Sequence, residues 1–206
     1  MKVVRADAEG ERVTAEWLLQ GGVAVVPTDT VYGLAARPAE VDAVRTIYRL
    51  KGRPEGMHLP VLAANAEQVR SLGVAFTPAA EELARHWWPG PLTLAFGFGL
   101  QPDRPDWLRG RTEVAVRIPA HHFLHAVLQE TGVLVVTSAN PHGTPTPLTA
   151  KGVAGALGSA VELVVDGGEL QDVPSTLVNV NGPTPSIERE GAIARQAIIE
   201  TMQEAP

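Results

Sequence analysis

The chain has 206 residues, of which 45% are hydrophobic, and its formal net charge is −6. A chain of this length can fold as one domain that buries roughly 70% of the surface its unfolded form would expose. It contains no cysteine, which excludes disulfides, thiolate nucleophiles and cysteine-ligated metal sites. The negative charge argues against a surface that attracts RNA or anionic lipid over its whole extent, although it is compatible with a local basic cleft.

The first residues, through Glu11, carry charges and lack the apolar core of a signal peptide. No apolar run approaches the roughly 20 residues that a membrane-spanning helix needs. Together with the absence of cysteine, these features lead us to expect a cytoplasmic protein that contacts no membrane.

Strand and helix patterns alternate along the chain. Strands are predicted at residues 23–26, 59–64, 92–98, 113–118, 133–136, 161–165 and 176–180. Helices are predicted at residues 13–20, 41–50, 66–72, 78–88, 122–131 and 192–202, with a short one after residue 149. There is no internal repeat and no break in composition, so the pattern predicts a single α/β domain over residues 1–206 with a mixed sheet.

A basic pair lies at the exit of the second predicted helix. Lys51 and Arg53 precede Pro54, which limits continuation of the helix. A bend there can turn both cations toward one pocket, where they suit phosphate. Each unit charge contributes roughly 4 kcal/mol of attraction at ~4 Å and an effective dielectric near 20. Taken alone, the pair more often marks a solvated helix end, because lysine and arginine commonly close helices.

Polar side chains also follow the predicted buried strand at 133–136. Ser138 and Asn140 alternate around Ala139, so both can project into one crevice with hydroxyl and amide groups free to bind a polar ligand. The alternative is a turn that begins at Asn140 and Pro141 and has no ligand.

Two arginines are further candidates. Arg117 interrupts an apolar strand just before Pro119, and such an arginine must reach solvent or meet an anion. A ligand carboxylate and an acidic residue of the chain itself are equally acceptable partners. Arg189 lies between Glu188 and Glu190, where a surface ion pair is a sufficient explanation.

Familiar catalytic and metal signatures are absent: the chain has no P-loop, H-E-x-x-H helix, G-x-S-x-G elbow or G-x-G-x-x-G turn. His121 and His125 are four residues apart and can share a helix face, but no third fixed ligand accompanies them. We therefore expect these histidines, with His122, to cap the helix or lie on the surface, and we expect no metal site built from protein ligands.

Taken together, six segments resemble the YrdC/TsaC family of threonylcarbamoyl-AMP synthases over almost the whole chain. They are PTDTVYGL at 27–34, KGRP at 51–54, WPGPLT at 88–93, VRIP at 116–119, TSAN at 137–140 and PST at 174–176. The resemblance implies an open, strongly twisted α/β sheet with flanking helices, whose concave face forms a basic cavity holding ATP beside threonine. The chain resembles the short form of the family, without an additional carboxyl-terminal domain.

The resemblance also implies roles for individual residues. The family positions that bind threonine correspond to Thr30, Arg117, Ser138 and Ser175. The positions that contact the nucleotide correspond to Lys51, Arg53, Asn140 and Arg189, and to Thr146, which takes the place of a serine. This context favours the functional interpretation of Lys51 and Arg53, which become the expected catalytic residues.

The implied reaction needs no protein nucleophile. Threonine adds to bicarbonate or carbon dioxide, and the carbamate attacks ATP and releases pyrophosphate. Mg²⁺ is expected as the cofactor, held mostly by phosphate and water. The product is expected to pass to a downstream tRNA threonylcarbamoyl transferase complex. The alternative function is a module that binds double-stranded RNA or tRNA, and weak RNA binding is compatible with either function.

The sequence departs from the family pattern in a few places. Met57, His58 and Leu62 stand where many relatives carry asparagine, proline and histidine, which puts ligand contacts from these positions in doubt. Glu113 stands where a small hydroxyl residue is common, and it is left out of the expected site because an acid beside a nucleotide is unfavourable. Proline-rich loops at 101–111 and 141–149 are candidates for closing over the ligand.

Overall fold

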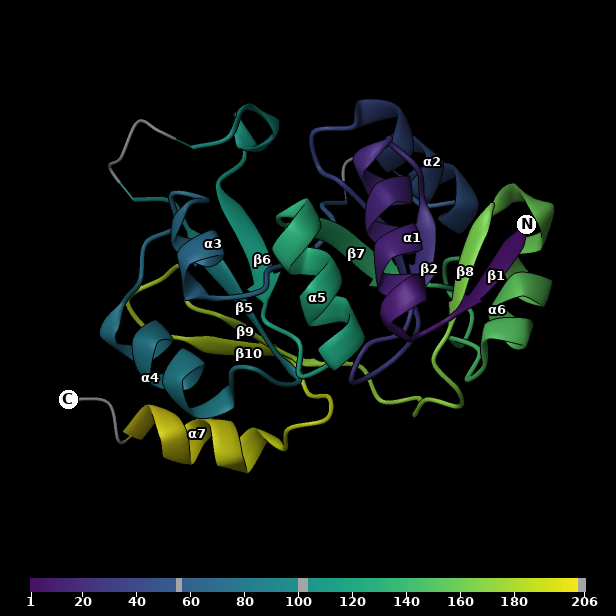
Figure 1. Ribbon diagram of the computed structural model, residues 1–206. Coiled ribbons are helices and arrows are strands. Elements are labelled where there is room, and N and C mark those ends of the chain that lie inside the picture. The colour runs from purple at the N-terminus through teal and green to yellow at the C-terminus, as the bar shows by residue number, and fades with distance from the viewer. Residues whose placement is uncertain (55–56, 100–103, 204–206) are drawn as a thin grey trace.

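Residues 1–54, 57–99 and 104–203 are described by the computed structural model, and in them ten strands form one mixed sheet. The strands are β1 (Lys2–Arg5), β2 (Ala24–Val26), β3 (Gly33–Ala36), β4 (Val61–Leu62), β5 (Leu92–Gly97), β6 (Glu113–Arg117), β7 (Leu134–Ser138), β8 (Leu163–Asp166), β9 (Thr176–Asn179) and β10 (Ser186–Arg189). Their order across the sheet is β1-β8-β2-β3-β7-β4-β6-β5-β9-β10. The sheet twists between the two ends of the molecule, and β1 and α7 (Arg195–Gln203) lie toward opposite sides of it (Figure 1).

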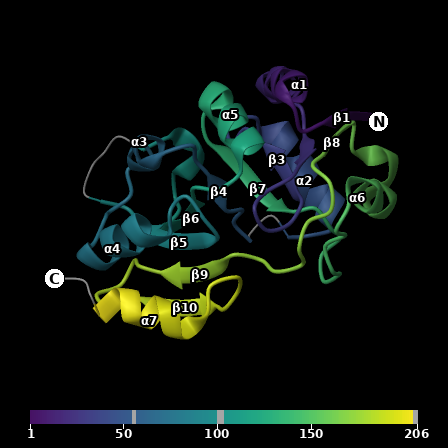
Figure 2. The same ribbon diagram turned by 60° about the horizontal axis from the view of Figure 1, so that its bottom comes forward.

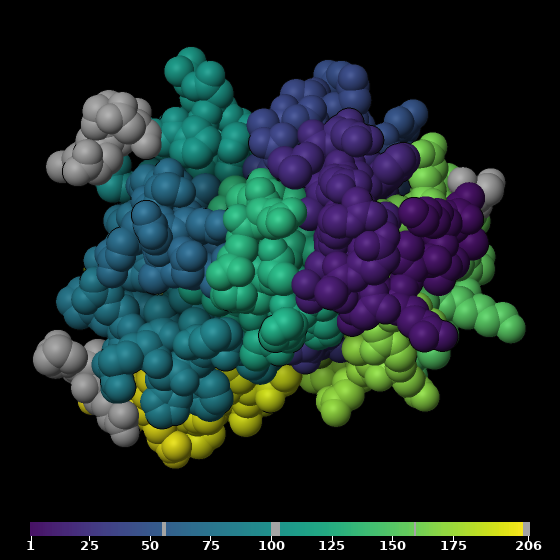
Figure 3. Space-filling model, viewed as in Figure 1, coloured from purple at the N-terminus to yellow at the C-terminus, as the bar shows by residue number. Residues whose placement is uncertain are grey.

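Helices flank this sheet. They are α1 (Ala8–Leu19), α2 (Val41–Lys51), α3 (Ala66–Arg70), α4 (Pro78–Trp87), α5 (His122–Thr131), α6 (Ala150–Leu157) and α7 (Arg195–Gln203), with 3-10 turns at Asp106–Leu108 and Gly158–Ala160. Helices α1 and α5 lie side by side over the sheet, while α7 lies beside α4 and next to β9 and β10 (Figures 1 and 2). On the surface, α5 lies between α1 and the region of α3 and α4 (Figure 3).

The sheet buries apolar side chains on both faces. In β7, Leu134 and Val136 pack with α1 and α5, whereas Val135 between them packs into the larger core on the other face. This division follows from the alternation of side chains along a strand. It confirms the sequence-based expectation of a strand buried on both faces, and it explains why the polar residues at the end of β7 emerge from the core.

Most predicted elements are present, with differences at their ends. The strand predicted at 59–64 is limited to Val61–Leu62, and the last helix begins at Arg195 instead of residue 192. Strands β1, β3 and β10 have no counterpart in the prediction. Strands β1 and β10 are short, mostly exposed edge strands, and β3 begins with glycine and lacks β-branched residues, so none has a strong strand pattern.

The predicted loop at 101–111 contains the turn Asp106–Leu108, and its residues 101–103 lie outside the described residues. None of the helices in the described ranges has the length and apolar character needed to cross a bilayer.

Candidate active site

A cavity of about 540 Å³ lies where several strands and α2 end, and its size suits a small-molecule ligand. Its wall includes eight of the nine residues that the sequence marks as site candidates: Thr30, Lys51, Arg53, Arg117, Ser138, Asn140, Ser175 and Arg189. The ninth, Thr146, is not among the lining residues, and the loop after β7 contributes His142 and Gly143 instead. The contact predicted for Thr146 stays a prediction.

The end of α2 brings the basic pair into this cavity. Gly52 follows the helix with φ 61° and ψ 33°, a left-handed conformation that glycine adopts without steric cost. The backbone N–H groups of Gly52 and Arg53 donate back to the carbonyls of Arg49 and Tyr48, both at 3.1 Å, which closes the helix. The chain therefore turns within one residue, and both Lys51 and Arg53 reach the wall of the cavity.

Lys51 is 4% exposed and joins α2 to the end of β7. Its Nζ donates to the backbone oxygens of Ser138 at 2.6 Å and Asn140 at 3.0 Å, and to Asn140 Oδ1 at 3.1 Å. The Ser138 hydroxyl lies 3.3 Å away. Burial lowers the pKa of Lys51 from 10.5 to about 8, and the positive charge of nearby Arg53 lowers it as well. Lys51 therefore holds the polar end of β7 in place and also puts a positive charge beside it.

Arg53 makes fewer hydrogen bonds to the protein than Lys51 does. Its NH2 donates to the His58 carbonyl at 3.2 Å. Its buried Nε has no hydrogen-bond partner among the described residues. A guanidinium that lines a cavity and keeps spare donors suits a phosphate group, which can accept two parallel hydrogen bonds. Of the two members of the basic pair, Arg53 is thus the one with donors to spare.

Asn140 is 7% exposed and ties the following loop to the strand end. Its Nδ2 donates to the carbonyls of Pro141, at 3.1 Å, and Thr144. The loop is also held to α2, because the His142 N–H donates to the Lys51 carbonyl at 2.7 Å. The turn predicted at Asn140 is therefore present, and Asn140 also lines the cavity.

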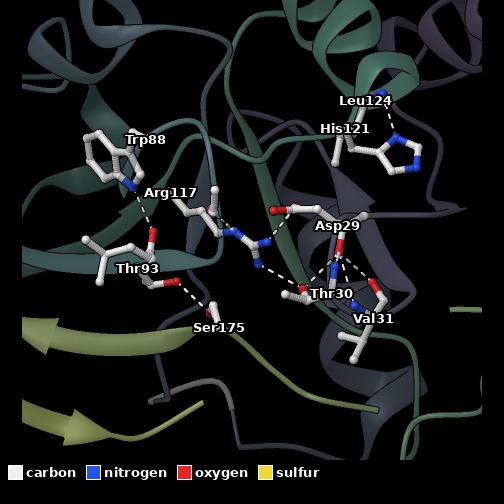
Figure 4. Close-up of polar contacts among 12 residues, drawn as sticks. Asp29, Thr30, Val31, Trp88, Thr93, Arg117, His121, Leu124 and Ser175 are labelled. Carbon is white, nitrogen blue, oxygen red and sulfur yellow. Dashed lines mark hydrogen bonds and ion pairs between the residues drawn. The ribbon is translucent and has the colours of Figure 1, made fainter. Parts of the chain in front are cut away.

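Arg117, at the end of β6, is 5% exposed and lies in a polar network (Figure 4). Its Nε donates to the Gly90 carbonyl at 2.9 Å and its NH1 to Thr30 Oγ1 at 2.9 Å, while its NH2 pairs with Asp29. These bonds use three of the five N–H groups of a guanidinium. Of the two partners left open by the sequence, an acid of the chain is present, and two N–H groups remain for a ligand carboxylate.

Ser175 forms the neighbouring part of the wall. Its hydroxyl lies 2.8 Å from Thr93 Oγ1, and Arg189 NH2 donates to the Ser175 carbonyl at 2.9 Å and hydroxyl at 3.2 Å. Arg189 Nε donates to the same carbonyl at 3.1 Å. These bonds direct Arg189 toward Ser175 and the cavity instead of toward the acids that flank it in sequence.

Several lining residues were missed or left out by sequence reasoning. Thr93 is buried within a recognised segment, but its strand position gives no signal of a role. His58 and Leu62 line the cavity despite their departure from the family pattern, whereas the Met57 side chain is exposed and is not among the lining residues.

Glu113 also lines the cavity. Sequence reasoning left it out of the expected site because an acid beside a nucleotide is unfavourable. Asn179 Nδ2 donates to Glu113 Oε2 at 3.3 Å and to Glu188 Oε1 at 2.8 Å. Glu113 lies at the start of β6 and Glu188 lies in β10, and both accept from the Asn179 amide. The wall is therefore acidic here and basic near Arg117.

His121 caps α5 and His122 lies on the surface, as expected, whereas His125 is half-buried. The Leu124 N–H donates to His121 Nδ1 at 3.4 Å at the start of α5, and the His122 side chain is 97% exposed. In residues 1–54, 57–99 and 104–203, no group of three or more His, Cys, Asp or Glu side chains is placed to hold a metal ion.

Comparisons with known proteins agree with the residue patterns. Residues 16–191 match the Sua5/YciO/YrdC family model, described as telomere recombination. A putative threonylcarbamoyl-AMP synthase of Mycobacterium tuberculosis is 34% identical over 185 residues, which cover 88% of this chain and 84% of the relative. The threonylcarbamoyl-AMP synthase of Bacillus subtilis is 36% identical over 191 residues, covering 89% of this chain and 54% of the relative.

Among solved structures, the crystal structure of Pyrococcus abyssi Sua5 complexed with L-threonine matches with a TM-score of 0.88 and 33% identity. The match covers 98% of this chain and 61% of that protein, so the chain spans little more than half of its longer relatives. The extent of the family match and the identity to the mycobacterial relative show that this chain belongs to the Sua5/YciO/YrdC family.

Proposed function

We propose that the chain forms threonylcarbamoyl-AMP and pyrophosphate from L-threonine, bicarbonate and ATP, which makes it a nucleotidyltransferase. The observation that carries the proposal is the meeting of two sets of donors in one cavity: a guanidinium with two spare N–H groups at Arg117, and a basic pair at Lys51 and Arg53. The first suits a carboxylate and the second a polyphosphate. The names of the relatives and the threonine bound to Pyrococcus abyssi Sua5 support the same substrates.

Threonine binds at the Arg117 end of the cavity. The two spare N–H groups of Arg117 hold its carboxylate, and the Thr30 hydroxyl helps to fix the guanidinium by accepting from Arg117 NH1. The hydroxyls of Ser138 and Ser175 face the same cavity and can bind the amine, the side chain or the carbamate. Bicarbonate supplies carbon dioxide and hydroxide. The neutral amine of threonine attacks the carbon dioxide, an N–C bond forms, and the proton released from the amine combines with the hydroxide as water, which leaves the carbamate.

The carbamate then reacts with ATP. One of its oxygens attacks the α-phosphorus, a new P–O bond forms, the bond to the β-phosphate oxygen breaks, and pyrophosphate leaves. Lys51 and Arg53 stabilise the charge that develops on the phosphate oxygens, and Asn140 and Arg189 help to hold the nucleotide. The chain contributes positioning and charge and forms no covalent intermediate.

Mg²⁺ is expected to bind together with ATP. We expect the ion to be held mainly by phosphate and water oxygens. When bound, Mg²⁺ offsets the negative charge of the polyphosphate leaving group.

The product is a reactive mixed anhydride, and we propose that a tRNA threonylcarbamoyl transferase complex consumes it. The alternative of a module that binds double-stranded RNA or tRNA gains no support from the names of the relatives. Weak RNA binding remains a separate expectation, and its signature is a steep loss of affinity as salt rises.

The proposal is tested by following pyrophosphate release from ATP and Mg²⁺ with purified protein. Release is expected to require both threonine and bicarbonate and to proceed without RNA. Release at the same rate without threonine would contradict the proposal, as would a requirement for RNA.

A further inference from the structure

Arg117 carries the threonine end of the proposed site, yet an arginine side chain is flexible and its orientation must be imposed by its neighbours. Three acceptors impose it here: the Gly90 carbonyl, the Thr30 hydroxyl and the Asp29 carboxylate. Only Asp29 carries a charge. Its side chain is 12% exposed and that of Arg117 is 6% exposed, so the pair is largely removed from water.

We propose that Asp29 is a positioning residue for threonine: it fixes the Arg117 guanidinium so that the two spare N–H groups meet the substrate carboxylate, and it does so without touching the substrate. This inference rests on the proposed function. Asp29 is not among the described residues that line the cavity, although its neighbours Thr28 and Thr30 are. Its carboxylate therefore affects the site only through its contact with the Arg117 guanidinium.

The local turn does not depend on the Asp29 side chain. Thr28 closes this turn, because its Oγ1 accepts from the backbone N–H groups of Thr30 at 3.0 Å and Val31 at 3.2 Å and donates to the Val31 carbonyl at 2.8 Å. Asp29 forms no such bond, and Arg117 is the one partner of its carboxylate within the described part of the chain. The second carboxylate oxygen, Oδ2, is buried and has no hydrogen-bond partner there.

A buried carboxylate with a single partner is poorly explained by stability alone. Removing two charges from water costs several kcal/mol for each ion, and a buried ion pair is often no more stabilising than apolar residues in its place. Orientation is the better explanation. Holding a long side chain in one rotamer before the ligand arrives removes the entropy cost of ordering that side chain from binding.

The contacts of Arg117 leave free the two hydrogens that a carboxylate needs. Asp29 takes one N–H of NH2 and Thr30 takes one of NH1, so each terminal nitrogen keeps one hydrogen. A carboxylate that bridges the two terminal nitrogens needs one hydrogen from each. If Asp29 were absent, the guanidinium would lose its anchor at NH2 and could rotate away from this arrangement.

The experiment compares Asp29→Ala and Asp29→Asn with the wild-type chain by calorimetric titration with threonine and, separately, with ATP and Mg²⁺. Asp29→Ala is expected to weaken threonine binding at least tenfold and to change ATP binding less than twofold. Asp29→Asn keeps an oxygen acceptor for NH2 and is expected to recover most of the loss. Asp42→Asn, in an exposed ion pair with Arg45 on α2, is the matched control and should bind both ligands like the wild type.

Wild-type threonine affinity in Asp29→Ala would overturn the inference, as would an equal loss of threonine and ATP binding in both variants. An Asp29→Asn variant as weak as Asp29→Ala would also overturn it, since charge and not orientation would then be the cause. If Asp29→Ala fails to fold, Asp29→Glu takes its place, because it keeps the charge and displaces the carboxylate by one methylene. A loss of threefold or more for threonine alone is then expected, and unchanged affinity would overturn the inference.

A second readout is independent of ligand. Solvent exchange of the Arg117 Nε–H, followed by NMR, is expected to be at least tenfold faster in Asp29→Ala and to slow again in Asp29→Asn; equal exchange in all three proteins would overturn the orienting role. Failure of the proposed function has a different signature, because the wild-type chain itself would then bind no threonine.

Discussion

Lys51 and Asn140 are joined twice: the lysine Nζ lies 3.0 Å from the backbone oxygen of Asn140 and 3.1 Å from its Oδ1. The two residues are 89 positions apart in the sequence and come from the ends of α2 and β7. The same asparagine holds the Thr144 carbonyl through its Nδ2. One buried ammonium therefore links the basic pair, the polar strand end and the loop that follows it.

Lys51→Met is expected to lower both stability and ATP use. The change leaves buried oxygens of Ser138 and Asn140 without their donor, which costs about 1–3 kcal/mol for a buried unsatisfied group. It also removes a cation from the phosphate end, for which a loss of roughly 100-fold in kcat/KM for ATP is expected. Denaturant unfolding and steady-state kinetics measure the two effects.

Lys151→Met, on the exposed surface of α6, is the matched control for this lysine and is expected to change neither quantity. Normal stability and full activity in Lys51→Met would contradict the role given to this ammonium.

The pKa of Lys51, lowered by burial and then by Arg53 from 10.5 to about 8, gives a pH dependence. Below pH 8 the ammonium is charged in the folded and unfolded states. Between about pH 8 and 10.5 the folded state has lost a proton that the unfolded state keeps, so this group adds stability as pH rises. The cation at the phosphate end disappears over the same range. KM for ATP is therefore expected to rise above about pH 8, and this rise should be absent in Lys51→Met.

Arg53→Ala is expected to impair ATP use with little effect on folding, because the single bond to His58 that it breaks lies near the surface. A loss of about 100-fold in kcat/KM for ATP is expected for a donor that stabilises developing phosphate charge. Threonine affinity should stay within a few fold of the wild type. Arg49→Ala, at an exposed position of α2, is the control, and equal activity in both variants would remove Arg53 from the site.

Arg117→Ala is expected to weaken threonine binding more than ATP binding. It also leaves the Asp29 carboxylate buried without its partner, a change that typically costs about 3–5 kcal/mol. Denaturant unfolding should therefore detect a large loss, whereas Arg12→Ala, in an exposed pair on α1, should show almost none. A larger effect on ATP than on threonine would mean that the two ends of the cavity are assigned the wrong way round.

Two parts of this site follow from local sequence patterns, whereas Thr30, Ser175 and Arg189 were assigned to it by the resemblance to the family. The apolar run of β7 predicted a strand that delivers Ser138 and Asn140, and the step from helix to Pro54 predicted where the basic pair lies. Bonds between distant segments have no such signal. The sequence left the partner of Arg117 open, because nothing near it in the chain points to Asp29, 88 residues away.

The acidic part of the wall shows another limit of local patterns. Glu113 was set aside because an acid beside a nucleotide is unfavourable, but its place at the start of β6 puts it on the cavity. Its neighbour Asn179 comes from β9, and only the order of strands across the sheet brings the two together. Strand order depends on long-range packing, so this pairing could not be read from either segment alone.

The most direct test of the central claim is the fate of labelled bicarbonate. Purified protein is incubated with ATP, Mg²⁺, threonine and ¹³C-bicarbonate, and the adenylate fraction is analysed by mass spectrometry alongside a reaction without threonine. The account predicts an adenylate that contains threonine and one ¹³C atom, formed together with pyrophosphate. An adenylate without the label, or no threonine-dependent adenylate at all, would contradict it.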